Sequence, residues 1–329
     1  PTLIRFHRSV LATLSIHLIH LPPPNGCRLC QKDCAITNQK RLRYKIEKEE
    51  GKGVDHGCDY YPPTFVLPSE YHMFVESFKQ HKDSVWIMKP ASGAQGKRIF
   101  LFSKLSEINE WKKDTRFKPE AEDKKETYIV QRYIANPYLI AGKKFDLRIY
   151  VLVTSFSPMR AWLYREGFAR FSGSLFSMDR KEITNNFIHL SNVAVQKTAD
   201  GYDKSKGCKW MMSSVKTYMT SQFGEEAVRG CWQEMNRVFT RSLESVQNLV
   251  INDPHCFEVF GYDIIIDDAL KPWLVEVNAS PSMSADTPDD YKLKTGLLDD
   301  TFGIIEMGLL GTDRDYNRVG GYDLLWNDG

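Results

Sequence analysis

The stretch from Gly261 to Met283 constrains the fold of this 329-residue chain more than any other segment. Two apolar runs, Tyr262–Ile266 and Trp273–Val277, flank a polar turn, so the sequence predicts a β-hairpin. Both strands of the hairpin carry oxygen-bearing side chains among branched apolar neighbours. These side chains are Asp263 on the first strand, and Glu276 and Asn278 on the second.

The three oxygen ligands predict a metal site on this hairpin. A carboxylate among apolar neighbours loses its hydration at a high free-energy cost unless a cation compensates it. Two carboxylates and an amide form a hard-oxygen site of the kind that Mg²⁺ prefers beside phosphate. From this segment alone, an ordinary hairpin with a solvent-facing acidic edge is the alternative.

Charge is balanced over the whole chain but not along it. The chain has 44 Lys and Arg against 42 Asp and Glu, so its overall field favours no nucleic acid or other charged partner. Between Lys143 and Lys181, eight basic residues stand against three acidic ones, which suits an acidic peptide or simply a solvated basic face. No apolar run reaches membrane-spanning length, so no membrane is expected as a partner.

The seven cysteines lack the pattern of a secreted protein and indicate a reducing compartment. Cys27, Cys30 and Cys34 form C-x-x-C-x-x-x-C, which would make a zinc site together with Cys58 or His56. No matching second pair follows, which disfavours zinc.

Residues 1 to about 35 are left out of the fold prediction. Val10–Leu21 is apolar and follows two arginines, as in a signal sequence, but two histidines interrupt it and no cleavage site follows. Because the chain also begins with proline, we expect a fragment or an imperfect gene model here, with this segment disordered.

A strand, a small-residue loop and a second strand are predicted between Val85 and Phe102. The loop Ala91–Lys97 allows backbone N–H groups to approach phosphate oxygens, and Lys97 adds charge, although a plain turn is the alternative. The loop is not a Walker sequence, which would open a helix. Lys89 ends the first strand in apolar surroundings before a proline, so it is expected to have a partner.

Three further strands carry polar side chains. Tyr128–Ile134 is predicted to be a buried strand whose last four residues either face an adenine or form a plain edge. From Lys144 to Thr154, alternation puts the charges of K-F-D-L-R on one face, as one wall of a polar cleft or as a solvated face. Ala161–Phe171 is interpreted as a pair of strands, and the charge-rich segment 112–126 as a surface loop.

Two amphipathic helices are predicted. One is capped by Ser69 and ends at Gln80, and the other spans Glu225–Val250. Their apolar stripes are interpreted as core, and the chain is expected to end in an irregular Gly-rich tail. The stripe residues are Met73, Phe74 and Phe78 in the first, and Val228, Trp232, Met235, Phe239, Leu243, Val246 and Leu249 in the second.

The order of these motifs resembles the tubulin tyrosine ligase-like family, and most closely its ciliary polyglutamylase branch. The motifs span residues 60 to 325 and are K-P with its loop, Q-R-Y-I, K-F-D-L-R, H-L-S-N, Y-D-I-I-I-D and W-L-V-E-V-N-A-S-P-S. The resemblance implies an α+β ATP-grasp fold, with antiparallel sheets flanked by helices. It divides the chain into an N-terminal remnant (36–83), a central subdomain (84–134) and a C-terminal subdomain (135–329), with the nucleotide between the last two.

The resemblance also implies a role for each motif residue. Phosphate contacts are implied for Lys89, Gln95, Gly96, Lys97, Ser191 and Asn192, and an adenine pocket for Gln131, Arg132, Tyr133 and Ile134. Lys144 and Asp146 would line the nucleotide and ribose side, Arg148 and Arg170 would hold substrate carboxylates, and Asp263, Glu276 and Asn278 would hold Mg²⁺. The implied catalytic residues are Lys144, Arg148, Arg170 and Glu276.

The implied function is an ATP- and Mg²⁺-dependent ligase that joins free glutamate to glutamate side chains of tubulin tails through an acyl phosphate. Phosphoryl transfer needs cations more than a nucleophile, so the lack of a compelling Ser-His or Cys-His pair fits. A long basic extension that would grip microtubules is missing, which suggests accessory subunits or a ciliary scaffold. The expected location is the cytoplasm and cytoskeleton, at a ciliary axoneme or basal body.

The sequence departs from the family pattern at several positions. Arg98 stands where the family usually has glycine, Ser191 replaces threonine, and the N-terminal domain looks incomplete. These departures leave two alternatives open: an inactive, nucleotide-binding structural subunit of cilia, or a related ligase that adds glycine or tyrosine.

Overall fold

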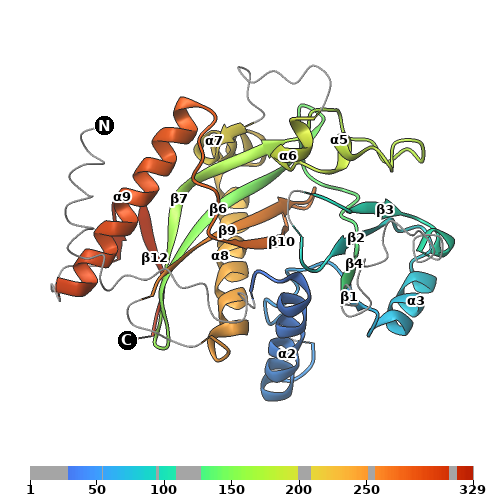
Figure 1. Cartoon of the computed structure of the whole chain (residues 1–329), viewed down its shortest axis with the longest axis horizontal. Helices are drawn as coiled ribbons and strands as arrows, with labels where there is room; N and C mark the ends of the chain where they lie inside the picture. The colour runs from blue at the N-terminus through green and yellow to red at the C-terminus, as the bar shows by residue number, and fades with distance from the viewer. Residues whose placement is uncertain are drawn as a thin grey trace, which may run out of the picture.

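The structure is a computed structural model that describes residues 29–53, 55–93, 96–108, 127–198, 209–250, 256–310 and 317–328. A four-stranded and an eight-stranded antiparallel sheet lie next to each other, and helices flank both (Figure 1). This arrangement confirms the predicted α+β class with antiparallel sheets. The described helices include none with the length and apolar character needed to cross a bilayer. The predicted loop 112–126 lies outside the described residues.

The smaller sheet has the strand order β1-β4-β2-β3. Its strands are β1 (Thr64–Leu67), β2 (Trp86–Pro90), β3 (Phe100–Phe102) and β4 (Tyr128–Arg132), and α3 (Tyr71–Gln80) packs on it. Phe74 of α3 is fully buried, with its ring edge-on to Trp86 at a centroid distance of 5.3 Å. Met73, predicted in the same stripe, is instead 58% exposed, because Phe74 and Phe78 already fill the sheet-facing side of this short helix.

The N-cap of α3 lies one residue later than predicted. Glu70 takes the N-cap position, and its carboxylate accepts a hydrogen bond from the Val66 N–H at 2.7 Å. The Ser69 hydroxyl donates to the Val66 carbonyl at 3.2 Å instead of capping the helix. The start of α3 is therefore fixed by contacts back to β1.

The larger sheet has the order β10-β9-β6-β7-β12-β11, with β5 on β6 and β8 on β7. Its strands are β5 (Leu139–Ile140), β6 (Lys143–Phe156), β7 (Met159–Phe171), β8 (Lys209–Met211), β9 (Glu258–Ile266), β10 (Pro272–Ala279), β11 (Arg318–Val319) and β12 (Tyr322–Asn327). The β9–β10 hairpin confirms the predicted one, with the register Glu276 opposite Asp263.

Two predictions about this sheet are wrong. Ala161–Phe171 is not a pair of strands but part of one long strand, β7, which runs through Gly167 without a break. A Cβ at Gly167 would lie 2.3 Å from the Arg148 carbonyl oxygen, so glycine allows β6 to stay paired there. The chain end is not irregular either, because β12 pairs with β7 and buries Tyr322.

Helices flank the larger sheet (Figure 1). They are α2 (Lys32–Glu50), α5 (Asn186–His189), α6 (Val193–Gln196), α7 (Met212–Phe223), α8 (Glu225–Gln247) and α9 (Pro288–Leu310). The apolar stripe of α8 packs on the sheet as predicted, from Val228 to Val246. Leu249 is an exception: α8 ends at Gln247, which leaves Leu249 38% exposed.

The N-terminal exclusion extended too far along the chain. Helix α2 begins at Lys32, and Ala35 and Ile36 in its first turns are buried. Asp33 lies in its first turn, where a negative charge stabilises a helix N-terminus. Helix α2 contacts α8, β1 and β4, so it belongs to the folded core, whereas residues 1–28 lie outside the described part of the chain.

Candidate active site in the cleft between the sheets

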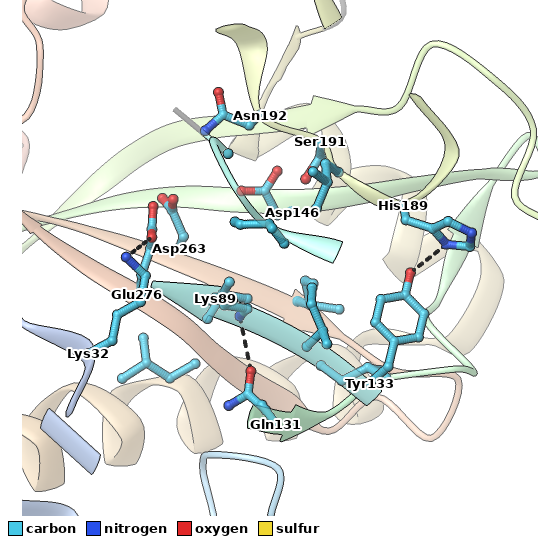
Figure 2. A pocket seen from close by; sticks show the side chains of 18 of the residues that line it. Lys32, Lys89, Gln131, Tyr133, Asp146, His189, Ser191, Asn192, Asp263 and Glu276 are labelled. Atoms are coloured by element: carbon cyan, nitrogen blue, oxygen red, sulfur yellow. Dashed lines mark hydrogen bonds and ion pairs between the residues drawn. The ribbon is translucent and has the colours of Figure 1, made fainter. Parts of the chain in front are cut away.

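A cleft with about 960 Å³ of empty space, part of it open to solvent, lies between the two sheets. Figure 2 shows side chains from both sheets and from α2 turned toward it. Of the residues singled out in the sequence, Lys89, Gly96, Lys97, Gln131, Arg132, Tyr133, Ile134, Lys144, Asp146, Arg170, Ser191, Asn192, Asp263 and Glu276 line it. Arg148 and Asn278 stand directly behind this lining, and Gln95 lies outside the described residues.

Lys89 lies on β2 with only 5% of its surface exposed. Its ammonium donates to the Gln131 side-chain oxygen at 3.0 Å, and the Gln131 amide donates onward to the Thr64 hydroxyl at 2.8 Å. Burial lowers the pKa of Lys89 to about 8, although Glu276 acts in the opposite direction. The ammonium is therefore buried against neutral partners and is poorly compensated, which makes the position favourable for an anion.

Lys144 is buried in a similar way at the start of β6. Its ammonium donates to the Tyr133 hydroxyl oxygen at 2.9 Å and to the His189 carbonyl at 2.8 Å. Burial is the main reason why the pKa of Lys144 is lowered to about 7; Asp146 opposes this change, and Lys89 adds to it. No ion pair found among the described residues includes Lys89 or Lys144, and the hydrogen-bond partners of both ammonium groups are neutral.

The arginines have a different environment, which follows directly from the sheet register. Strand β6 lies between β9 and β7, and it pairs Arg148 with Asp263 on one side and Asp146 with Arg170 on the other. Arg148 Nε lies 2.5 Å from one Asp263 oxygen, and the Arg170 guanidinium lies 2.8 Å from the other. Arg170 Nε also donates to Asp146 at 3.1 Å. Two arginines and two aspartates therefore form one buried network.

This network controls the charge of Asp263. Burial raises the pKa of Asp263, but Arg148 and Arg170 have the larger combined effect and hold that pKa well below its usual range. The pKa of Arg170 is raised, because Asp146 and Asp263 outweigh the effect of its burial. Asp263 and the two arginines are therefore ionised at neutral pH.

The three predicted metal ligands lie together. The Asn278 side-chain amide is 3.5 Å from an oxygen of Asp263 and 3.5 Å from an oxygen of Glu276. In the described ranges, no group of three His, Cys, Asp or Glu side chains is arranged to hold a metal, so a metal here would need the Asn278 oxygen as well. The donor set of two carboxylates and an amide fits Mg²⁺, and both carboxylates now have cationic partners in its place.

The partner of Glu276 is Lys32, which the sequence prediction missed. Lys32 Nζ lies 3.3 Å from Glu276 Oε2 and donates to the Gly93 carbonyl at 3.2 Å (Figure 2). Lys32 is the first residue of α2, so it connects this helix to both the small-residue loop and the β9–β10 hairpin. It was missed because it falls in the excluded N-terminal segment, and no local pattern in the sequence marks it.

A second missed residue is His189, the first letter of the H-L-S-N motif. Its Nδ1 lies 3.0 Å from the Tyr133 hydroxyl, and its carbonyl holds Lys144. Ser191 and Asn192 of the same motif received roles, but His189 did not, because a histidine at the end of a short helix gives no sign of its partner.

Comparison with known proteins identifies the family. A sequence profile of the tubulin-tyrosine ligase family matches residues 15–311. The chain belongs to this family. The resemblance of the six motifs is thereby confirmed, and the two sheets with the cleft between them are the version of the family fold that this chain adopts.

Several curated relatives cover most of the chain. The Bos taurus protein named probable tubulin polyglutamylase TTLL9 is 48% identical over 332 residues, which cover 93% of this chain and 71% of the relative. The Caenorhabditis elegans protein named probable tubulin polyglutamylase ttll-9 is 48% identical over 304 residues, with coverages of 92% and 70%. The Tetrahymena thermophila protein named probable alpha-tubulin polyglutamylase Ttll1 is 43% identical over 290 residues, with coverages of 86% and 70%.

The small-residue loop contains Arg98, which the sequence analysis predicted to stand at a glycine position of the family pattern. Arg98 adopts a left-handed backbone with φ of 58°. Its guanidinium donates to the Tyr128 hydroxyl at 3.3 Å. Gly96 is also left-handed, and a Cβ there would lie 2.9 Å from the Val195 side chain. The loop therefore keeps the conformation that glycine favours, with some strain at Arg98.

Proposed function

We propose that this chain is an ATP-dependent ligase that adds glutamate to glutamate side chains in the C-terminal tails of tubulin. Polyglutamylase names among relatives 43–48% identical over most of the chain support the activity. One structural observation carries the proposal. Two buried ammonium groups, which form no ion pair with any carboxylate among the described residues, lie in the same cleft as the oxygen-bearing side chains of the β9–β10 hairpin.

The proposed reaction has two steps. A carboxylate oxygen of the acceptor glutamate attacks the γ-phosphorus of ATP, the bond from that phosphorus to the bridging oxygen breaks, and ADP leaves. The amine of free glutamate then attacks the carbonyl carbon of the acyl phosphate, phosphate departs with the bonding electrons, and the amine loses a proton. Both steps depend on charge stabilisation and orientation rather than on a protein nucleophile.

The residues of the cleft divide these tasks. Lys89, Lys97 and Lys144 would bind phosphate oxygens, and Gln131 to Ile134, with Asp146, would bind the adenosine. Ser191, Asn192 and Gly96 would complete the phosphate contacts. Asp263, Glu276 and Asn278 would hold Mg²⁺, which when bound would neutralise charge on the transferred phosphoryl group.

Arg148 and Arg170 would hold the carboxylates of the acceptor and of the incoming glutamate. A guanidinium pairs with a carboxylate through two parallel hydrogen bonds, and this geometry is already realised between Arg148 and Asp263 at 2.5 and 3.1 Å. Substrate carboxylates would therefore replace or share the positions that Asp263 and Asp146 take in this structure.

The wider setting is also part of the proposal. The partners would be the acidic tubulin tail, free glutamate, and accessory subunits or a ciliary scaffold, in the cytoplasm and cytoskeleton of a cilium or its basal body. The basic segment from Lys143 to Lys181 includes Arg148 and Arg170 at the cleft, which supports an acidic acceptor.

One observation favours a second function. The left-handed backbone of Arg98 strains the loop next to the phosphate site, as in a relative that no longer turns over ATP but still binds it as a structural subunit of cilia. The assembled ligands of the β9–β10 hairpin argue against this, because a purely structural subunit has no need of them. A ligase that adds glycine or tyrosine is the remaining alternative for the donor.

Incorporation of labelled amino acids into microtubules tests the proposal. Radiolabelled glutamate, glycine and tyrosine are each incubated with brain microtubules, Mg-ATP and the protein, with a ciliary extract as a source of partners. We expect label from glutamate only, and none with Glu276→Gln. Label from another donor would change the substrate assignment, and no label even with the extract would support the structural subunit.

A further inference from the structure

Lys144 has a set of contacts that goes beyond ordinary burial. Its ammonium lies over the Tyr133 ring at 4.6 Å from the ring centre, and it donates to the Tyr133 hydroxyl oxygen and to the His189 carbonyl. These two hydrogen bonds, at 2.9 and 2.8 Å, occupy two of the three ammonium hydrogens. The side chain lines the cleft, so the third hydrogen remains for a ligand.

The protonation of His189 follows from its two neighbours. Its Nε2 lies 3.0 Å from the Glu182 carbonyl oxygen, which can only accept, so Nε2 carries the proton. In the neutral ring Nδ1 is then an acceptor, and the Tyr133 hydroxyl, 3.0 Å away, donates to it. The hydroxyl oxygen of Tyr133 is left with lone pairs that receive the Lys144 N–H. The three groups thus form a chain of hydrogen bonds in which Lys144 donates to Tyr133 and Tyr133 donates to His189.

The ring of His189 has little freedom to leave this chain. It is 1% exposed and packs edge-on against Tyr133 at 5.5 Å and against Phe176 at 5.9 Å between ring centres. Figure 2 shows the Tyr133–His189 pair at one end of the cleft, opposite the Lys32–Glu276 pair at the other end. The chain is therefore a rigid support at the end of the cleft away from the hairpin ligands.

We propose that His189 and Tyr133 are positioning residues that hold Lys144, in its charged form and in a fixed orientation, for contact with the nucleotide phosphates. This inference rests on the proposed nucleotide site, because Lys144 is the residue that would touch the ligand. Neutral His189 directs the Tyr133 hydroxyl, and the hydroxyl and the His189 carbonyl fix the ammonium. This role of the Tyr133 hydroxyl is separate from the contact that the rest of Tyr133 would make with the adenosine.

The pH dependence of this device follows from its surroundings. Lys144 faces Lys89 on β2, Asp146 on its own strand, and Tyr133 and His189, while His189 faces Lys144 and Glu182. Burial lowers the pKa of His189, which keeps its ring neutral and its Nδ1 available near neutral pH. Removing the Tyr133 hydroxyl removes an acceptor for the charged ammonium, so it lowers the pKa of Lys144 further, and the charge needed for phosphate is lost at a lower pH.

ATP binding by the whole chain, measured by calorimetry from about pH 6 to about pH 9, tests the proposal. The variants are Tyr133→Phe, His189→Leu and His189→Asn, where the asparagine amide reaches the level of Nδ1 and can accept from Tyr133. Tyr138→Phe is the control, since Tyr138 packs on Phe145 and Phe223 outside the cleft lining. A thermal melt of each variant separates lost binding from lost folding.

We expect Tyr133→Phe and His189→Leu to weaken ATP binding roughly ten-fold, the size of one lost hydrogen bond to a charged group. The alkaline limb of their affinity profile should move to lower pH, while His189→Asn recovers most of the affinity and Tyr138→Phe is unchanged. Wild-type affinity and an unshifted profile in Tyr133→Phe would overturn the proposal, even if His189→Leu does not fold. A wild-type chain that binds no ATP at any pH would instead overturn the nucleotide site itself.

Discussion

Two groups of cations in and behind the cleft lining have opposite surroundings: the lysine group, Lys89 and Lys144, and the arginine group, Arg148 and Arg170. Lys89 and Lys144 are buried against an amide, a hydroxyl and a carbonyl, and burial lowers the pKa of each, to about 8 and about 7. Arg148 and Arg170 are buried against Asp263 and Asp146, and the pKa of each arginine is raised. Among the described residues, the two lysines form no ion pair, whereas the two arginines are neutralised by Asp263 and Asp146.

This difference determines which ligand each group of cations binds more easily. An anionic ligand at the lysines gains a cation without displacing any protein carboxylate, so binding there is favoured from the start. A carboxylate at the arginines has to compete with Asp263 and Asp146. A cation bound to Asp263 would weaken that competition. We therefore expect the lysine group to bind the nucleotide first and the arginine group to bind carboxylates afterwards.

The largest effect is expected when the neutralised network loses an anion. Asp263→Asn leaves the two arginines partly unpaired in a buried site, which should lower the free energy of unfolding by about 3–5 kcal/mol. Urea denaturation measures this loss, and Asp179→Asn, on the exposed surface, serves as the control. An Asp263→Asn protein as stable as the control would mean that the network is not holding the sheet together.

The same network predicts an acid limit. The pKa of Asp263 is lowered on folding, so its contribution to stability is full above the unfolded value of about 4 and is lost as pH falls through the lower folded pKa. Denaturation curves between about pH 5 and about pH 2 should show this loss in the wild type and a smaller one in Asp263→Asn. Parallel losses in both proteins would assign the acid limit to other groups.

Glu276 separates catalysis from stability. Glu276→Gln removes a proposed metal charge but no core packing, so turnover should fall by a factor on the order of 10²–10³ while the unfolding midpoint changes little. Glutamate incorporation and a thermal melt on the same samples check both parts, with Glu226→Gln on the exposed start of α8 as the control. Near-normal turnover would remove Glu276 from the site.

Removing a charge from the lysine group should change stability in the opposite direction to removing one from the arginine network. Lys89→Met removes a buried charge that has only neutral partners, so it should raise the stability at pH 7 by on the order of 1–3 kcal/mol while ATP affinity falls. Because the folded pKa of Lys89 is lower than the unfolded one, the wild type gains stability from about pH 8 upward, and the gap to the variant should narrow by about pH 10. A less stable Lys89→Met at pH 7 would contradict this.

The smallest effect is expected at Arg98. Arg98→Gly relieves a left-handed backbone and should stabilise the chain by about 1 kcal/mol, less the lost contact to Tyr128. Ala141→Gly is a matched control, because Ala141 has a φ of 50°, is exposed, and lies outside the cleft lining. Both variants should melt slightly higher, and only Arg98→Gly should change ATP affinity. Equal affinities would show that the loop backbone does not influence the nucleotide site.

Local patterns explain which parts of the site were predictable. The alternation of K-F-D-L-R put Lys144, Asp146 and Arg148 on one face of β6, where Lys144 and Asp146 line the cleft and Arg148 stands behind them. The hairpin pattern brought Asp263 and Glu276 together. Both depend on a period of two within a few residues, which the sequence displays directly. The end of the second long helix was misjudged at Leu249, since nothing in the local pattern shows where packing on the sheet stops.

The remaining features depend on contacts between distant segments. Lys32 reaches Glu276 across 244 positions, and His189 reaches Tyr133 across 56. The pairing of Arg148 with Asp263 needed the order of the strands, β9 beside β6, which no motif states. The sequence therefore identified most of the groups in the cleft, but not which of them neutralise one another. That pairing determines what the lysine group and the arginine group can bind.

The most direct test of this division measures two ligands on two variants. Calorimetric titration with a non-hydrolysable ATP analogue and Mg²⁺, followed by glutamate, is carried out on the wild type, Lys144→Met and Arg148→Ala. We predict that Lys144→Met loses analogue binding, whereas Arg148→Ala keeps it within about two-fold and loses at least ten-fold in glutamate affinity. The reverse pattern, or equal losses of both ligands in both variants, would contradict the assignment of the nucleotide to the lysine group and of carboxylates to the arginine group.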